Sequence, residues 1–161
     1  MTDAVVFEVL PLDGLLVHEE VVPAKVAALA ATLGRGGVFR DPIWVARGTG
    51  VILNGHHRTA ALRRMGAVRI PAWVLDYDSD VVRLERWTPG PPVTKAEVVR
   101  RARSGELYPP QTTRHILSVD LPAHPTPLAE LLPRGVQPDR GVSARRAGAG
   151  RSSRARSSPP G

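Results

Sequence analysis

The sequence contains no cysteine. A disulfide framework, a thiolate zinc site and a cysteine nucleophile are therefore all excluded. No stretch approaches the roughly 20 consecutive apolar residues that span a bilayer, and the N-terminus lacks the basic start and apolar run of a signal peptide. We therefore expect a soluble, cytoplasmic protein without membrane contact.

Acidic residues are scarce at the C-terminal end, and this concentrates the positive charge there. The chain carries a formal net charge of +7, and residues 134–161, with seven arginines and one aspartate, account for +6 of it. A body that carries only +1 does not have the charge of a domain that grips a phosphate backbone. We expect at most a weak nucleic-acid contact, made by the basic tail.

The length is that of one ordinary domain with appendages. Hydrophobic residues make up 42% of the chain, but residues 134–161 consist almost entirely of Arg, Ala, Gly, Ser and Pro. Such a segment cannot bury enough surface to offset the entropy lost on ordering. We predict one folded domain over residues 1–133 and a disordered tail over residues 134–161.

The body alternates between strand and helix patterns. The apolar run 5–10 predicts a first strand that ends at Pro11. Apolar residues at the spacing of one helix face then predict a helix that begins at Pro23 and stops at Gly34. Segments 43–46 and 51–53, joined by a turn, predict a β-hairpin.

Later segments continue this alternation. We predict a helix over residues 59–65 and a strand over 70–75, in which Pro71 indicates an edge position or a strand start with an unpaired N–H. Thr94 and Glu97 match a capping box and open a helix that reaches about residue 104. Residues 108–115 are rich in proline and predict a positioned loop. The pattern as a whole favours an α+β fold.

One turn has the properties of an anion site. Asn54 and Gly55 lead directly from a strand into a helix that opens with His56, His57 and Arg58. Such a turn gathers free N–H groups and the positive end of the helix dipole at one point, which favours phosphate. Glycine allows close backbone approach, and arginine can hold two phosphate oxygens at once.

A carboxylate in a second polar segment is a candidate base. Glu19 follows His18 just before the first helix, and Glu20 fits a solvated or capping residue. If Glu19 faces the phosphate turn, it can take the proton of an alcohol that attacks a terminal phosphoryl group. Zinc ligation by the histidines ranks lower, because His56 and His57 are adjacent and lack the helical spacing of zinc ligands.

Residues 51–76 carry a family resemblance in the run VILNGHHRTAALRRMGAVRIPAWVLD. This run resembles the core of the ParB N-terminal/sulfiredoxin-like superfamily, in which a strand, a turn and a helix bind nucleotide phosphates. The resemblance implies a small mixed sheet with helices packed around it. The branch most similar is that of the free-serine kinases, which form O-phospho-L-serine with ADP or ATP. His18-Glu19, the double histidine and residues 110–115 point to that branch.

The resemblance also implies roles for individual residues. Glu19 would deprotonate the serine hydroxyl, and His57 would be a second catalytic residue. The nucleotide phosphates, bridged by Mg²⁺, would lie at Asn54, Gly55, His56, His57, Arg58 and Thr59. The amino acid would be held at Trp87, Thr113, Arg114 and His115.

Asn54 departs from this family pattern. The family usually has aspartate before the glycine, so asparagine removes a negative charge that could assist Mg²⁺. We expect Asn54 to cap the following helix, and the fold to survive the change.

The other branches of the superfamily fit less well. Sulfiredoxin chemistry needs a cysteine in the phosphate turn, and ParB partition proteins need further DNA-binding and dimerisation segments that do not fit after residue 115. Two functions remain open, namely a small-molecule serine kinase and a ParB-like nucleotide-binding regulator or DNA-binding module without kinase activity. A degenerate, inactive relative also remains open, and the choice among ADP, ATP and CTP is not encoded by any local motif.

Overall fold

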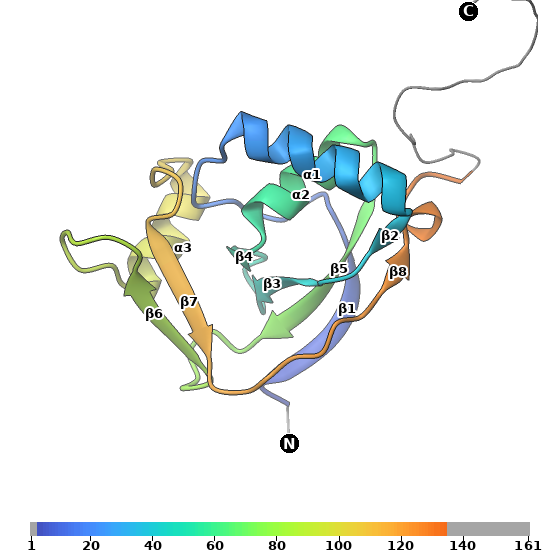
Figure 1. The fold of residues 1–161 in the computed structure, drawn as a ribbon. Helices are drawn as coiled ribbons and strands as arrows, with labels where there is room; N and C mark the ends of the chain where they lie inside the picture. Colours follow the sequence, from blue (N-terminus) through green and yellow to red (C-terminus); the bar gives the residue numbers. More distant parts are fainter. Residues whose placement is uncertain (1–2, 135–161) are drawn as a thin grey trace, which may run out of the picture.

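The computed structural model describes residues 3–134. The predicted tail, apart from its first residue, therefore lies outside the described residues. Helices lie around a central sheet, and an antiparallel pair of strands with a third helix forms the opposite end of the molecule (Figure 1). Among residues 3–134, no helix combines the length and the apolar character that crossing a membrane requires.

Four strands form the central sheet, in the order β1-β5-β3-β4. Strand β1 (Val5–Pro11) runs antiparallel to β5 (Arg69–Leu75), and β5 runs parallel to β3 (Ile43–Ala46). Strand β4 (Ile52–Asn54) pairs antiparallel with β3. The sheet is mixed, so the predicted α+β class and the predicted hairpin over residues 43–53 are confirmed.

Helices α1 (Pro23–Gly36) and α2 (His56–Arg64) lie against each other above the sheet in Figure 1. Helix α3 (Lys95–Ser104) lies at the other end of the molecule, next to the antiparallel pair of β6 (Val82–Arg86) and β7 (Thr113–Leu117).

A short ladder and a single helical turn complete the described elements. Strand β2 (Val38–Phe39) pairs with β8 (Thr126–Pro127), which leads into the 3-10 helix η1 (Leu128–Glu130). The segment between β7 and β8 passes below the sheet in Figure 1, where His124 stacks on Phe7 of β1 with ring centroids 3.7 Å apart. The fifth histidine thus lies away from the other four.

The end of α1 and the position of β5 in the sheet differ from the sequence predictions. Helix α1 continues past Gly34, which is buried within it, and ends at Gly37, whose φ of 72° closes the helix with an N–H bond to Leu33. Strand β5 is central, so the edge position suggested by Pro71 is wrong. Pro71 lies one residue before Ala72, where pairing with β3 begins, so the alternative of a strand start fits this side of β5.

The antiparallel pair of β6 and β7 was not predicted. Residues 82–86 and 113–117 mix charged and apolar side chains, and β7 occupies the end of the stretch predicted as a loop. The predicted start of α3 is confirmed, because the Thr94 hydroxyl accepts a bond from Glu97 N at 3.1 Å. The Glu97 carboxylate binds Arg100 and Arg101 on its own helix.

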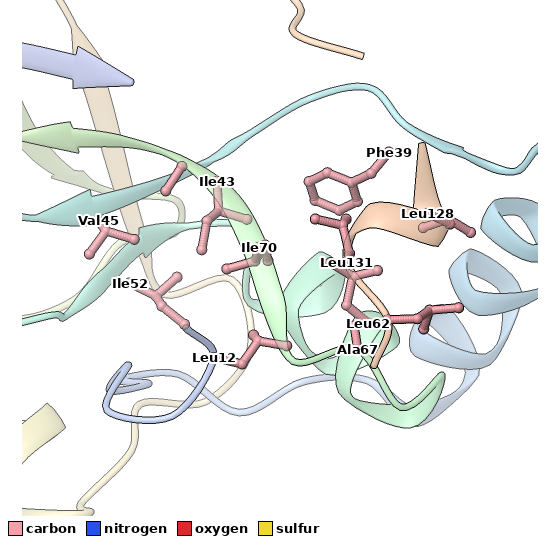
Figure 2. Packing of buried hydrophobic residues seen from close by; sticks show 12 residues of the cluster. Leu12, Phe39, Ile43, Val45, Ile52, Leu62, Ala67, Ile70, Leu128 and Leu131 are labelled. Atoms are coloured by element: carbon pink, nitrogen blue, oxygen red, sulfur yellow. The ribbon is translucent and has the colours of Figure 1, made fainter. Parts of the chain in front are cut away.

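Two apolar clusters hold these layers together. The first joins the sheet to α2, β2 and the turn at η1, and Figure 2 shows Ile43, Ile52 and Ile70 of the sheet facing Leu62, Phe39 and Leu131. The second joins the sheet to α3 and β6 through residues such as Leu75, Val82 and Val98. The short segment that links β4 to α2 therefore starts from a strand anchored in both clusters, through Ile52 and Leu53 respectively.

The corner between β4 and α2 depends on Gly55. Its φ is +108°, and a Cβ added there would overlap Ile43 Cγ2 and lie 2.9 Å from Ile43 Cβ. Gly55 itself occupies the N-cap position, and no side chain caps the helix. The expected cap by Asn54 is therefore wrong, because Asn54 is still the last residue of β4.

Replacing Gly55 with alanine should destabilise the fold. Left-handed backbone and a tight core contact together predict a loss of about 2–4 kcal/mol in the free energy of unfolding. Urea unfolding at pH 7.5 measures this loss. Gly36→Ala is the matched control, because nothing lies within 4 Å of its added Cβ, and it should be neutral or stabilising by up to about 1 kcal/mol. Equal stabilities of the two variants would contradict the account of the corner.

Candidate functional site

A cavity of about 190 Å³ lies where the β4–α2 corner meets the segment before α1 and the start of β7. The three polar segments singled out in the sequence all reach it. Its lining comprises Glu19, Lys25, Leu53, Asn54, Gly55, His56, His57, Trp87, Gln111, Thr113, Arg114 and His115. Glu19 and Gly55 thus face the same space, which is the juxtaposition that the sequence hypothesis needs.

The Glu19 carboxylate is held by the loop before β7 and by the first residue of that strand. Its Oε1 accepts a bond from Gln111 N at 3.0 Å, and its Oε2 accepts one from Thr113 N at 2.7 Å. The Thr113 hydroxyl donates a further, short bond to Oε2. Backbone bonds from Glu20 N to Tyr108 O and from Tyr108 N to His18 O, both 2.8 Å, align the two segments like neighbouring strands.

Three histidines form a buried cluster behind the carboxylate. The rings of His18 and His56 meet edge to face with centroids 4.5 Å apart, and the His115 ring lies 5.7 Å from that of His18. Burial lowers the pKa of His18 to about 4 and that of His115 to about 3. Burial, and then the neighbouring histidines, hold the pKa of His56 well below its usual value. All three rings are neutral near pH 7.

Hydrogen bonds fix two of the histidines at the start of α2. His56 Nε2 accepts a bond from His18 N at 3.2 Å, and His57 Nε2 accepts one from Val22 N at 3.0 Å. Nε2 of each ring therefore carries a lone pair, and the neutral ring carries its proton on Nδ1. Burial, followed by the charge of Lys25, lowers the pKa of His57.

The predicted amino-acid side of the cavity is formed by β7 and the end of β6. His115 Nε2 lies 2.7 Å from the Tyr77 hydroxyl, and burial raises the pKa of Tyr77. Trp87 is 56% exposed, and the Arg114 guanidinium lies 4.8 Å from its ring centre. Trp87, Thr113, Arg114 and His115 all line the cavity together with Glu19.

Arg58 and Thr59 do not line this cavity. Arg58 lines a neighbouring cavity of about 470 Å³ and donates to Pro42 O at 3.3 Å. The buried Thr59 hydroxyl donates to Gly55 O at 2.9 Å. Asn54 borders both cavities. In this structure the Arg58 and Thr59 side chains therefore bind the protein on either side of the glycine corner.

The oxygen ligands around the cavity suit a magnesium ion carried by phosphates better than an ion held by protein alone. Within residues 3–134, no group of three or more His, Cys, Asp or Glu side chains is arranged to hold a metal ion. The cavity offers the Glu19 carboxylate and the Asn54 amide as oxygen donors. Mg²⁺ commonly takes only one or two protein oxygens and completes its shell with phosphate and water.

Sequence analysis missed three residues of this region. Lys25 and Gln111 line the cavity, and Tyr77 binds His115. Lys25 offered a signal, because it lies in the first turn of α1, where the helix dipole disfavours a cation. The position of Lys25 is easier to understand if an anion is bound nearby. Neither Gln111 nor Tyr77 had a comparable signal in the sequence.

The fold of the described residues is similar to that of solved free serine kinases. The chain is superimposable on free serine kinase in complex with AMP with a TM-score of 0.72 and 21% identity, over 81% of this chain and 95% of that one. A variant of free serine kinase in complex with ADP gives a TM-score of 0.71 at 20% identity, over 78% of this chain and 94% of that one. These likenesses show a shared fold.

Sequence comparison identifies particular relatives. An ADP-dependent L-serine kinase of Thermococcus kodakarensis is 34% identical over 110 residues, covering 66% of this chain and 46% of that protein. An ATP-dependent L-serine kinase of Staphylothermus marinus is 37% identical over 82 residues, covering 48% of this chain and 32% of that protein. A ParB-like protein of Sulfolobus acidocaldarius is 44% identical over 70 residues, covering 44% of this chain and 35% of that protein.

The resemblance to the ParB/sulfiredoxin-like superfamily, and to its serine kinases in particular, is thus confirmed in sequence and in fold. No protein-family model matches the chain. The matched part of this chain spans 46% and 32% of the length of the two serine kinases named above.

The buried histidines predict a loss of stability in mild acid. The pKa of each of His18, His56 and His115 is lowered from 6.5 in the folded protein. Between about pH 6.5 and pH 4 the unfolded chain therefore binds more protons, and the free energy of unfolding falls as the pH falls. Each histidine contributes up to about 1.4 kcal/mol per pH unit in that window.

Urea unfolding at pH 7.5, 6.0 and 5.0 measures this slope. His115→Asn should lose stability at pH 7.5 and show a shallower decline toward pH 5, because one of the three groups has been removed. A free energy of unfolding that stays level or increases from pH 7.5 to pH 5 would contradict the buried, neutral cluster.

Proposed function

We propose that this protein is a kinase that transfers a phosphoryl group from ADP or ATP to the hydroxyl of free L-serine, giving O-phospho-L-serine. The observation that carries the proposal is the shared cavity of Glu19 and the Gly55 corner, which brings a candidate base to a phosphate-binding turn. The serine kinases among its relatives, by their printed names, act on the same amino acid with the same two nucleotides.

The phosphates would bind at the start of α2. No side chain caps this helix and no acidic residue lies in its first turn, so its free N–H groups and positive dipole end are available to an anion. Lys25 and His57 add a cation and a ring N–H at the same wall of the cavity. Asn54, Gly55 and His56 complete this wall, and Arg58 and Thr59 brace the corner from behind.

Glu19 would act as the general base through one particular oxygen. A carboxylate has about four acceptor positions. Two on Oε2 are taken by Thr113 and one on Oε1 by Gln111, which leaves about one free position, on Oε1. Oε1 would accept the serine hydroxyl proton while serine Oγ bonds to the terminal phosphorus. The bond from that phosphorus to its bridging oxygen breaks, and AMP or ADP leaves.

The other cavity residues would bind serine and position the phosphates. Trp87, Arg114 and His115 line the same cavity, where a cation suits the amino-acid carboxylate and a buried neutral imidazole suits a hydrogen bond. His57 would hold the transferred phosphoryl group in line with serine Oγ. Mg²⁺, held by the phosphates with Asn54 as a neighbouring oxygen donor, would neutralise charge on the phosphates when bound.

A nucleotide-binding regulator without kinase activity is the second candidate. Asn54 favours it, because an amide in place of the family's aspartate gives the magnesium a weaker ligand. The ParB-like relative is consistent with this reading. Nucleotide binding without any phosphoserine, with ADP or with ATP, would support the regulator and remove the kinase.

We also propose that residues 1–133 are the functional unit and that the protein acts in the cytoplasm. The basic residues 134–161 would supply any nucleic-acid binding, because this segment contains seven arginines. Salt-dependent DNA binding should then disappear when residues 134–161 are deleted.

Glu19→Gln should remove turnover and leave nucleotide binding nearly intact. The amide cannot accept the proton, so the rate of phosphoserine formation should fall by about 10²–10⁴-fold. Phosphoserine is quantified by chromatography and nucleotide affinity by calorimetry. Glu20→Gln is the matched control, because Glu20 is exposed and does not line the cavity. Equal rates for both variants would show that Glu19 is not the base.

Lys25→Met should weaken nucleotide binding and its dependence on salt. Loss of one exposed cation next to the phosphates predicts an affinity for ATP that falls by about 3–10-fold at low salt. Titration calorimetry at low and high ionic strength measures both effects. Lys25→Arg keeps the charge and should bind ATP nearly as the unaltered protein does. Unchanged affinity in the methionine variant would place the phosphates elsewhere.

A further inference from the structure

His18 has no role in the proposed reaction, although it is completely buried next to the candidate base. Its side chain has no solvent exposure and does not line the cavity. Its Nε2 lies 2.9 Å from Thr113 Oγ1, and that hydroxyl in turn contacts Glu19 Oε2. A continuous chain of three side chains therefore runs from the core to the candidate base.

The direction of this chain follows from the proton count. An ionised carboxylate can only accept, so the single hydroxyl proton of Thr113 points to Glu19. The hydroxyl oxygen is then the acceptor for His18, which must donate from Nε2. His18 Nδ1 is buried and makes no hydrogen bond of standard geometry within the described residues, although the Ile52 backbone lies near the ring. The proton on Nε2 is therefore assigned from the Thr113 contact alone.

Hydrogen bonds hold the backbone of His18 in place through both its N–H and its carbonyl group. His18 N donates to His56 Nε2 at 3.2 Å, and His18 O accepts from Tyr108 N at 2.8 Å. The ring cannot turn toward water, because burial is complete. Its lowered pKa, about 4, keeps it neutral near pH 7, so it carries one proton to donate.

We propose that His18 is a positioning residue that acts through Thr113: its Nε2–H orients the Thr113 hydroxyl onto Glu19 Oε2 and so keeps Oε1 facing the substrate. This role rests on the proposed function, because it serves the base of that reaction. The arrangement is a histidine–threonine–glutamate chain in which the histidine never receives the substrate proton. It stabilises one orientation of the carboxylate.

The tautomer of His18 tests the chain without any turnover. In ¹⁵N-labelled protein at pH 7, long-range ¹H–¹⁵N spectra should show His18 with its proton on Nε2, and His18→Gln identifies the signal by its loss. A proton on Nδ1, the tautomer that the nearby Ile52 backbone would favour, would overturn the proposal.

Kinetic variants test the consequence for catalysis. His18→Met removes the donor while nearly keeping the volume, and kcat should fall by about tenfold with little change in KM for serine or nucleotide. His18→Gln places an amide N–H near the position of Nε2 and should recover most of kcat. If the glutamine variant is no faster than the methionine variant, or if KM rises with kcat unchanged, the positioning role is overturned.

A double-mutant cycle separates positioning from general stability. Thr113→Val removes the hydroxyl through which His18 acts, so adding His18→Met to it should lower kcat little further, whereas Thr113→Ser should keep the effect of His18→Met. Additive losses in both backgrounds would overturn the chain. Far-UV circular dichroism and urea unfolding confirm that each variant is folded.

Failure of the proposed function gives a different result from failure of this inference. If the unaltered protein makes no phosphoserine, the kinase proposal fails, and the tautomer alone then decides whether the chain exists. If the protein makes phosphoserine and His18→Met turns over at the unaltered rate, the kinase proposal stands and the role of His18 is overturned.

Discussion

The contact between Glu19 and Thr113 joins residues that lie 94 positions apart and ties the N-terminal segment to the strand pair β6–β7. A carboxylate at 9% exposure is tolerated only if its oxygens are bonded, and three N–H and O–H groups from residues 111 and 113 provide those bonds. The same bonds leave part of Oε1 open to the cavity. The solvation of the buried charge and the orientation of the candidate base therefore have one physical cause.

The glycine corner at Gly55 is the second constraint, and it lines the same cavity as Glu19. A left-handed residue at the end of β4 lets α2 begin at once, with its free N–H groups at the cavity. The neighbouring histidines then use their ring nitrogens to hold the segment that carries Glu19, since His56 binds His18 N and His57 binds Val22 N. The start of α2 and the segment that carries Glu19 are thus connected by hydrogen bonds.

Much of this arrangement could be predicted from the sequence, and the reasons for the misses are physical. Local signals such as Pro23, the Thr94 cap and the apolar runs marked the helices and the central strands correctly, although Gly34 was mistaken for the end of α1. The strand pair β6–β7 was missed because its stability comes from cross-strand pairing between residues such as Glu85 and Arg114. These residues are far apart in the sequence, so a short stretch of sequence does not reveal the pairing.

The site followed the same division between local and long-range signals. Gly55 and its basic neighbours are close in sequence, so a phosphate site could be predicted there from a local motif. The placement of Glu19 beside them was a hypothesis from its polar segment before the first helix and from the family resemblance, and the cavity that both line now supports it. Gln111 contributes through its backbone N–H, which is not specific to any side chain, and therefore gave no sequence signal.

The pairing of residues 18–20 with Tyr108 makes the candidate site depend on contacts between distant parts of the chain. The donors that bind the Glu19 carboxylate belong to residues 111 and 113, so its oxygens have none of these bonds until that part of the chain has been synthesised and has docked. An unfinished or partly folded chain can therefore form the glycine corner without a correctly held carboxylate opposite it. Catalytic competence would appear last during folding, and the appearance of turnover would report completion of the native state more faithfully than the recovery of helix content.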